Sequence, residues 1–253
     1  MSHPPRFFVD APLSPASTIE LDIDIVRHIQ VLRLAAGDVI TVFNGQGGEY
    51  RSTLIDIQKK SATIHLDEFK AVTLEPPYSL TLAQGIAGGD KMDWIIEKAV
   101  ELGVTNFQPL QMEKCVVRLS AERAEKRLSH WRAIVQAASE QCGRNRFMNI
   151  LPVHNYSHWL AGATQSAEQT QPLAAQRILL SPRGTLKIDD CLLNGHAQHV
   201  ILLIGPEGGL TQAEEAAAFA AGWQGLSLGP RILRTETAGM AIVAALHARW
   251  GGF

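Results

Sequence analysis

Two stretches near the C-terminus decide the fold: LLIGPEGGLTQAE (residues 202–214) and LSLGPRILRTETA (residues 226–238). Each joins a short apolar run, typical of a buried strand, to a Gly-Pro dipeptide and then to the start of a helix. Open α/β sheets bind their ligands where the strands end and the chain turns toward a helix. We name residues 205–210 the first elbow and residues 227–234 the second elbow. Two elbows so close in sequence predict a ligand site that both of them build.

Strand and helix patterns alternate around the elbows from residue 79 onward. The patterns predict strands at residues 79–86, 104–110, 177–182, 199–206 and 225–230, and helices at residues 90–103, 121–142 and 235–250. Asp90 is the expected N-cap of the first helix and Gly103 its expected stop. Residues 162–176, rich in Gln, Ala, Ser and Thr, are typical of a surface loop. The alternation predicts an α/β fold with a mainly parallel sheet covered on both faces.

The first seventy or so residues follow a β pattern instead. Apolar alternation predicts strands at residues 39–43, 50–57 and 62–66, after a short helix at residues 24–32. The NGQGG stretch at residues 44–48 leads into a strand rather than a helix, so it predicts a turn and not a phosphate loop. Neither a strand nor a helix continues through the two prolines of LEPPY (residues 74–78). We therefore expect a small β domain at 1–73 and an α/β domain at 74–253.

Composition narrows the function classes. The formal charge of −2 argues against a protein that coats nucleic acid by bulk electrostatics. The chain has no apolar run near the ~18 residues of a membrane span and no secretory signal pattern, so we expect a cytoplasmic protein away from membranes. Cys115, Cys142 and Cys191 are far apart, and the histidines match no metal-binding motif, so we expect no metal.

One stretch is more basic than the chain as a whole. Residues 113–146 carry eight Lys and Arg against four Glu. A solvated helix face with ion pairs such as Glu122 with Lys126 explains part of this charge. It does not explain GRNR (residues 143–146), where two arginines follow a glycine that stops the helix.

The last predicted helix, TETAGMAIVAALHARW (residues 235–250), is apolar on nearly every side. Such a helix is buried all round, which indicates either a central position or a subunit interface and favours a dimer. Several polar residues near the elbows have structural explanations. Thr211 and Glu214 form a capping-box pattern, Thr235 suits an N-cap, and Glu236 falls in a first helical turn.

The chemistry of the elbows restricts the ligand. The chain contains neither G-x-G-x-x-G nor G-x-x-x-x-G-K-[ST], and Glu207 in the first elbow would repel a phosphate. A third strand exit, LLSPRG at residues 179–184, adds to the same edge. The three loops suit an adenine and a ribose without phosphate that bind to backbone groups. S-adenosylmethionine, with its cationic sulfonium, has this character.

The two elbows together closely resemble the signature of SPOUT-class RNA methyltransferases, and more narrowly of the RsmE family. Four further motifs lie in the same order as in that family: RFF at residues 6–8, VLRL at 31–34, EKAVELGV at 97–104 and EQCGRNR at 140–146. The resemblance implies S-adenosylmethionine-dependent methylation of N3 of uridine-1498 in the 16S ribosomal RNA of the small ribosomal subunit. It also implies a homodimer, a PUA-like RNA-binding β-barrel at the N-terminus, and a deep trefoil knot that places the cofactor between the elbows.

The site residues follow from the motifs and the resemblance together. For cofactor binding we predict backbone groups of Leu180, Gly205, Glu207, Gly208, Leu228, Gly229, Ile232 and Leu233, with Thr237 nearby. For catalysis we predict Arg234, Glu236 and, from a partner region, Arg144. N3 of uracil must lose a proton, and an arginine can stabilise the negative charge that develops on the carbonyls. For phosphate contacts with RNA we predict Arg6, Arg33, Arg118, Arg144 and Arg146.

Two other functions remain open from the sequence. The first is a doubly wound nucleotide- or NAD-dependent enzyme with a small β domain, although the phosphate fingerprint is missing. The second is a non-catalytic RNA-binding or ribosome-assembly factor, which would not need two unbroken elbows. Binding of S-adenosylmethionine without methyl transfer would favour the second.

Overall fold

The computed structural model describes residues 4–169, 175–193 and 198–253 of the 253-residue chain. The chain divides into two compact units. Unit 1 consists of Met1–Glu75 with Gln136–Phe147, and unit 2 of Pro76–Val135 with Met148–Phe253. Unit 1 thus includes a segment from the middle of the sequence that no local pattern indicates. The functional division at residues 73 and 74 stays a prediction.

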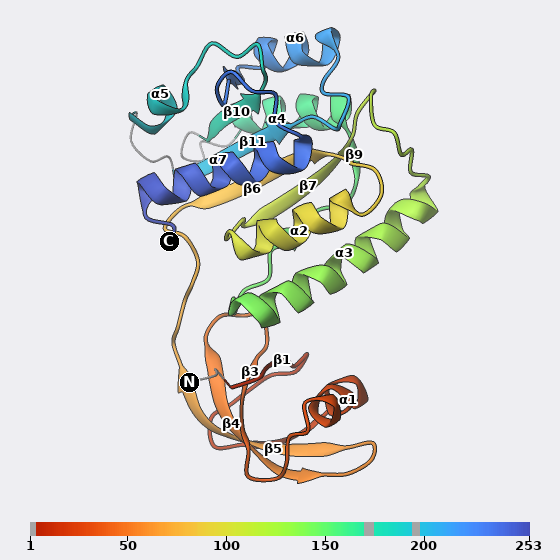
Figure 1. Cartoon of the computed structure of the whole chain (residues 1–253), viewed down its shortest axis with the longest axis vertical. Coiled ribbons are helices and arrows are strands. Elements are labelled where there is room, and N and C mark those ends of the chain that lie inside the picture. Colours follow the sequence, from red (N-terminus) through yellow and green to blue (C-terminus); the bar gives the residue numbers. More distant parts are fainter. Residues whose placement is uncertain (1–3, 170–174, 194–197) are drawn as a thin grey trace. The chain divides into compact units, whose positions relative to one another are not determined.

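Unit 1 is a curled sheet with one helix packed against it (Figure 1). Its described elements are β1 (Arg6–Phe8), β2 (Thr18–Leu21), α1 (Ile23–Val31), β3 (Val39–Phe43), β4 (Glu49–Ile57) and β5 (Ala62–Lys70). The strand order is β1-β3-β4-β5-β2, with β1 parallel to β3 and the other pairs antiparallel. The three predicted strands, the turn between the first two and the helix are confirmed. The two strands of three and four residues carry too little alternation to be recognised.

Unit 2 contains a parallel sheet. Its described strands are β6 (Ser79–Gly85), β7 (Asn106–Gln111), β8 (Asn149–Ile150), β9 (His154–Asn155), β10 (Gln176–Leu180), β11 (His199–Ile204) and β12 (Gln224–Leu226). Their order is β12-β10-β11-β6-β7-β8, with β9 beside β7, and each pairing is parallel. The mainly parallel sheet is therefore confirmed.

Helices cover both faces of this sheet. The described helices of unit 2 are α2 (Lys91–Glu101), α4 (Tyr156–Gln169), α5 (Ile188–Leu193), α6 (Gln212–Ala220) and α7 (Thr235–Trp250), and α3 (Ala121–Cys142) begins in unit 2 and ends in unit 1. In Figure 1, α2 and α7 lie in front of the strands and α4 lies behind them. The central strands β6 and β11 are buried on both faces, with Leu80, Leu82, Leu202 and Leu203 fully buried. This burial explains the continuous apolar run of β11, whereas β6 also buries Thr81 and Gln84.

Two sequence expectations need correction. Residues 162–169, expected as a loop, continue the helix α4, while residues 170–174 lie outside the described part of the chain. The N-cap of α7 is Arg234 rather than Thr235, whose side chain is buried beneath the first elbow. Within the single chain, Thr237, Ala241 and Ala248 of α7 are exposed, so the subunit-interface alternative for this helix stays a prediction.

Other local expectations are confirmed. Gly103 follows α2 with φ of 72°, and Lys126 pairs with Glu122 at 2.7 Å on α3. The trefoil knot stays a prediction. Within the described residues, no helix is both long enough and apolar enough to cross a membrane.

Candidate functional site

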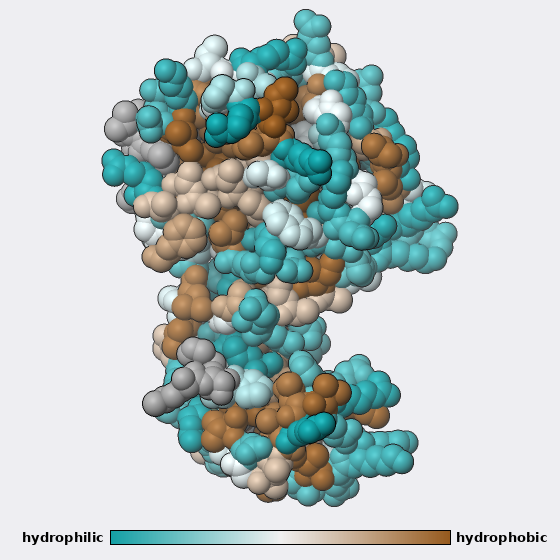
Figure 2. All heavy atoms as spheres, in the orientation of Figure 1, coloured by the Kyte–Doolittle hydropathy of each residue, from teal (hydrophilic) through white to brown (hydrophobic). Residues whose placement is uncertain are grey.

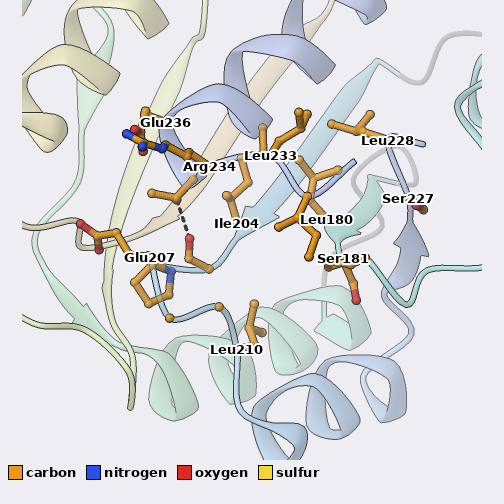
Figure 3. A pocket seen from close by; sticks show the side chains of 18 of the residues that line it. Leu180, Ser181, Ile204, Glu207, Leu210, Ser227, Leu228, Leu233, Arg234 and Glu236 are labelled. Carbon is orange, nitrogen blue, oxygen red and sulfur yellow. Dashed lines mark hydrogen bonds between the residues drawn. The ribbon is translucent and has the colours of Figure 1, made fainter. Parts of the chain in front are cut away.

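A pocket of about 670 Å³ lies at the carboxyl ends of β10, β11 and β12 (Figure 3). Parallel strands bring their carboxyl ends to one edge of a sheet, so the elbows that are separate in sequence meet there. The walls come from residues 180–183, 204–210, 226–229 and 231–236, with Lys91, Lys114, Glu215 and Ala238. All of these residues belong to unit 2.

Close backbone approach shapes the first elbow. A Cβ atom on Gly205 would lie 2.8 Å from Leu210 Cδ1 and 3.0 Å from the Gly209 carbonyl carbon, so only glycine fits. Gly209 has φ of 66°, which turns the chain toward α6. Thr211 and Glu214 then form the predicted capping box at the start of α6. The Glu214 carboxylate also accepts a hydrogen bond from the Glu113 backbone N–H at 2.8 Å, which ties the elbow to the loop after β7.

The second elbow supplies apolar wall. Gly229 has φ of 100°, and the half-buried Leu228 and Leu233 flank the turn. Figure 3 shows Leu228, Leu233, Ile204 and Leu180 gathered in the middle of the pocket. Ile232 is 85% exposed, and Figure 2 shows hydrophobic side chains among hydrophilic ones over this part of the molecule.

The third strand exit is braced by a buried carboxylate. Glu215 on α6 is 6% exposed and accepts hydrogen bonds from the Ser181 hydroxyl and the Arg183 guanidinium. The Arg183 backbone N–H donates to Ser181 Oγ at 3.1 Å. These contacts hold the loop after β10 against the start of α6, so that Leu180 lies against the pocket.

Glu207 points its carboxylate away from the apolar wall, toward the loop after β6 (Figure 3). Its Oε1 accepts from the Gly88 backbone N–H at 2.9 Å and from Lys91 Nζ at 3.0 Å. Burial raises the pKa of Glu207, but hydrogen bonds from Gly88, from its own backbone N–H and from Lys91 outweigh it and hold the pKa below its usual value. The side chain therefore ties the first elbow to the loop after β6 as a carboxylate.

Two charged residues at the start of α7 have unused bonding capacity. Oε2 of Glu236 is buried and receives no hydrogen bond from the residues that the structure describes. Arg234 is exposed and lines the same pocket. Figure 3 places both side chains on the same side of the pocket as Glu207, away from the cluster of leucines. A buried carboxylate oxygen without a donor is costly unless a ligand or substrate group meets it.

The structure brings most of the predicted site residues together. Of the residues predicted for the cofactor, eight line the pocket: Leu180, Gly205, Glu207, Gly208, Leu228, Gly229, Ile232 and Leu233. Thr237 is exposed on α7, outside the described lining. Sequence reasoning missed Lys91, Lys114, Ser181 and Arg231, which also line the pocket. Lys91 begins α2 and Lys114 lies in the loop after β7, both distant in sequence, but Arg231 lies inside the second elbow and could have been found there.

Arg144, predicted for catalysis and for RNA, is a buried residue of unit 1. It is 3% exposed, and its Nε and Nη2 donate to the two carboxylate oxygens of Glu75 at 3.0 Å and 2.6 Å. Arg6 is also engaged within unit 1, where its guanidinium contacts Glu49 and Asn145 and donates to the Gly143 carbonyl at 3.0 Å.

Three of the predicted RNA-contacting arginines are exposed: Arg33, Arg118 and Arg146. Arg118 donates to the Glu113 carbonyl at 2.5 Å. The Arg146 side chain packs against the turn after β3. A Cβ atom on Gly47 in this turn would lie only 2.9 Å from Arg146 Nη2. Of the five predicted arginines, these three are exposed, whereas Arg6 and Arg144 would have to break the contacts described above to reach a phosphate.

The pocket can hold an S-adenosylmethionine. Its apolar wall and glycine backbone suit an adenine and a ribose. The two lysines at the first elbow already have partners, since Lys91 Nζ donates to Glu207 and Lys114 Nζ donates to the Leu210 carbonyl at 3.2 Å. The buried Glu236 Oε2, which receives no hydrogen bond from the described residues, offers a negative group to a cation or an acceptor to an N–H group. Among the described residues, no cluster of three or more His, Cys, Asp or Glu could hold a metal ion.

Comparisons with known proteins agree with this geometry. A family model described as an RNA methyltransferase domain matches residues 74–247, and a model described as an RNA methyltransferase PUA domain matches residues 21–67. The chain is 30% identical to ribosomal RNA small subunit methyltransferase E of Bacillus subtilis (strain 168), over 95% of each chain. It is 32% identical to the protein of the same name from Buchnera aphidicola subsp. Schizaphis graminum, covering 98% of this chain and 97% of the relative.

Solved structures are similar over the whole chain. One is a ribosomal RNA small subunit methyltransferase E from Neisseria gonorrhoeae bound to S-adenosyl methionine, 38% identical with a TM-score of 0.88 over 98% of each chain. Another, from Legionella pneumophila, is in complex with the cofactor SAM and is 29% identical with a TM-score of 0.87 over 98% of each chain.

Proposed function

Since the chain belongs to the ribosomal RNA small subunit methyltransferase E family, we propose that it methylates N3 of one uridine, uridine-1498, in the 16S ribosomal RNA of the small subunit. It is an RNA methyltransferase that uses S-adenosylmethionine. The observation that carries the proposal is the pocket between the two elbows, with an apolar wall on one side and the open Glu236 carboxylate on the other.

The residues divide the task between binding and proton transfer. Bound S-adenosylmethionine supplies a methyl group on a sulfonium. Backbone groups of the elbows and the side chains of Leu180, Leu228 and Leu233 hold the adenosine part and exclude water. Thr237 remains a proposed neighbour of the cofactor, in the first turn of α7.

Glu236 and Arg234 are the proposed catalytic residues. Uracil N3 carries a proton at neutral pH, and Glu236 Oε2 is free to accept the N3–H and take that proton. The Arg234 guanidinium stabilises the negative charge that develops on the uracil carbonyls as the proton leaves. Because N3 lies on the Watson–Crick edge, the uridine enters the pocket unpaired and turned out of its stack.

RNA contacts and the assembly state complete the proposal. We assign phosphate contacts to Arg33, Arg118 and Arg146, while the buried Arg6 and Arg144 keep RNA and catalytic roles only as predictions. The exposed small residues Thr237, Ala241 and Ala248 on α7 let a second copy approach closely, which supports a homodimer. The proposed site of action is the cytoplasm, where ribosomes assemble.

Methyl transfer to isolated subunits tests the proposal. The protein is incubated with S-adenosylmethionine labelled in the methyl group and with small or large ribosomal subunits that lack methylation. We expect label only in the 16S RNA of small subunits. Label in the large subunit, or binding of the cofactor without transfer to either subunit, would contradict the proposal, and the second result would favour an assembly factor.

A further inference from the structure

Three segments of unit 2 converge beneath the pocket on one buried hydrogen-bond network. They are the end of β6, the first elbow after β11, and the first turn of α7. The network joins the side chains of Gln84 and Thr235 to the carbonyls of Gly85 and Gly205. Gln84 is fully buried and Thr235 is 7% exposed, so water does not compete for these bonds.

The direction of each bond follows from the two backbone carbonyls, which can only accept. Thr235 Oγ1 donates to the Gly205 carbonyl at 2.6 Å and accepts from Gln84 Nε2 at 2.8 Å. Gln84 Nε2 also donates to the Gly85 carbonyl at 2.9 Å and lies 3.4 Å from the Gly205 carbonyl. Gln84 Oε1 is buried and receives no hydrogen bond from the part of the chain that the structure describes. The amide nitrogen is therefore the end of Gln84 that holds the network together.

The segments that carry these bonds are closely packed. A Cβ on Gly85 would lie 2.5 Å from the Pro206 nitrogen, so the exit of β6 touches the first elbow backbone to backbone. A Cβ on Gly239 would lie 2.9 Å from Ile204 Cδ1, so α7 also packs closely against β11. Small displacements of Thr235 are thus transmitted directly to the first elbow.

We propose that Gln84 and Thr235 are positioning residues, which hold the start of α7 and the first elbow in the alignment that methyl transfer requires. Thr235 lies between Arg234 and Glu236, so the bond to Gly205 ties both proposed catalytic side chains to a backbone group that lines the pocket. This inference rests on the proposed function. It concerns Gln84, which is not part of the described pocket lining, and Thr235, which belongs to the pocket wall but whose hydroxyl is bonded to the Gly205 carbonyl. Both residues act through their neighbours.

The network predicts a specific effect for Thr235→Val, which keeps the shape of the side chain and removes the hydroxyl. We expect kcat to fall about 100-fold, as for a misplacement near 1 Å, while the Kd for S-adenosylmethionine changes only a few-fold because many backbone groups hold the cofactor. Thr235→Ser keeps the hydroxyl and should restore most of the activity. Gln84→Glu places a carboxylate oxygen against the Gly85 and Gly205 carbonyls, and should lower kcat at least as much.

Thr81→Val is the matched control. Thr81 lies on the same strand β6, is 8% exposed, and bonds through Oγ1 to His199 Nε2 at 3.0 Å, but it is not part of the described pocket lining. The measurements are the thermal midpoint of unfolding, the Kd for S-adenosylmethionine, and the kcat of small-subunit methylation at saturating substrates. A merely structural role predicts that Thr81→Val and Thr235→Val lose stability and activity in parallel.

The outcomes separate the two claims. Loss of kcat in Thr235→Val with wild-type kcat in Thr81→Val and rescue in Thr235→Ser supports the positioning role. An active wild type whose Thr235→Val variant has unchanged kcat overturns this inference and leaves the proposed function intact. A wild type that binds the cofactor and methylates no subunit overturns the proposed function and this inference with it.

Discussion

Glu236 is the residue on which the chemistry depends most. Its Oε2 atom is buried without a described donor, in the first turn of a helix where the macrodipole favours a carboxylate. Two other carboxylates around the pocket accept hydrogen bonds. Glu207 accepts from Lys91 and from the Gly88 backbone N–H, and Glu215 accepts from Ser181 and Arg183. The contrast between carboxylate oxygens with and without a hydrogen-bond donor supports the proton-accepting role that we propose for Glu236.

Glu236→Gln should abolish proton transfer while keeping the size of the side chain. We expect single-turnover methylation to fall by roughly 100- to 10,000-fold, the usual range for loss of a general base, with unchanged affinity for S-adenosylmethionine. Glu97→Gln, on the solvent side of α2, is the control and should keep full activity. Normal turnover in Glu236→Gln would remove this carboxylate from the mechanism.

Arg144→Ala should act on stability. The substitution leaves the Glu75 carboxylate without its two-bond partner in unit 1, and we expect the free energy of unfolding to fall by about 3–5 kcal/mol. Denaturant unfolding measures the loss. A variant with wild-type stability and lost turnover would instead support the catalytic role that the sequence predicts for Arg144.

At the scale of elements, the bounds of two long helices were predictable. Helices α3 and α7 begin and end where the sequence predicts, because each is an unbroken run of helix-compatible residues that a glycine follows, Gly143 after α3 and Gly251 after α7. The fold of residues 162–169 could not be predicted, since a stretch of Gln, Ala, Ser and Thr fits a helix or a loop and tertiary packing decides. The elbows were recognisable because a Gly-Pro dipeptide after an apolar run marks a turn through the backbone preferences of these two residues alone.

The contacts between elements could not be predicted from sequence. The bonds from Gln84 to Thr235 and from the Gly88 backbone N–H to Glu207 link residues more than a hundred positions apart, so no local pattern reveals them. The same holds for Arg144, whose GRNR setting resembles an exposed phosphate site. Its burial depends on Glu75, which lies in the proline-rich stretch between the predicted domains.

The stability that Glu207 adds by linking the first elbow to the loop after β6 should depend on pH. The folded pKa of Glu207 lies below its usual 4.5, so its carboxylate stabilises the fold fully above pH 4.5 and this contribution is lost as the pH falls through the folded pKa. We expect Glu207→Gln to lose ~1 kcal/mol of unfolding free energy at pH 7, since the ion pair is partly exposed. The difference from wild type should shrink below pH 4.5 in urea unfolding. A difference that is equal at pH 7 and pH 3 would contradict this account, and Glu122→Gln serves as the exposed control.

At the scale of the whole molecule, a chain with a formal charge of −2 must bind RNA through local groups rather than through its total charge. The exposed arginines Arg33, Arg118 and Arg146 come from both units. Sequence alone identified them but did not separate them from Arg6 and Arg144, because burial of an arginine is a property of the folded chain.

Replacing the exposed arginines with alanine should weaken binding to small subunits and reduce its dependence on salt. Each lost phosphate contact should lower the slope of log K against log salt by ~0.7–0.9, with unfolding free energy unchanged. Arg6→Ala is the contrasting variant and should mainly lower the stability of unit 1. Equal salt slopes for wild type and the triple variant would show that these arginines do not contact phosphate.

Nucleoside analysis of small-subunit RNA tests the central claim most directly. Subunits that lack the modification are treated with the protein and methyl-labelled S-adenosylmethionine, and the 16S RNA is digested to nucleosides for mass spectrometry. The account predicts label in 3-methyluridine at a single position, and its absence with Glu236→Gln. Label in any other nucleoside, or label in 3-methyluridine at the wild-type rate with Glu236→Gln, would contradict the account of how this pocket works.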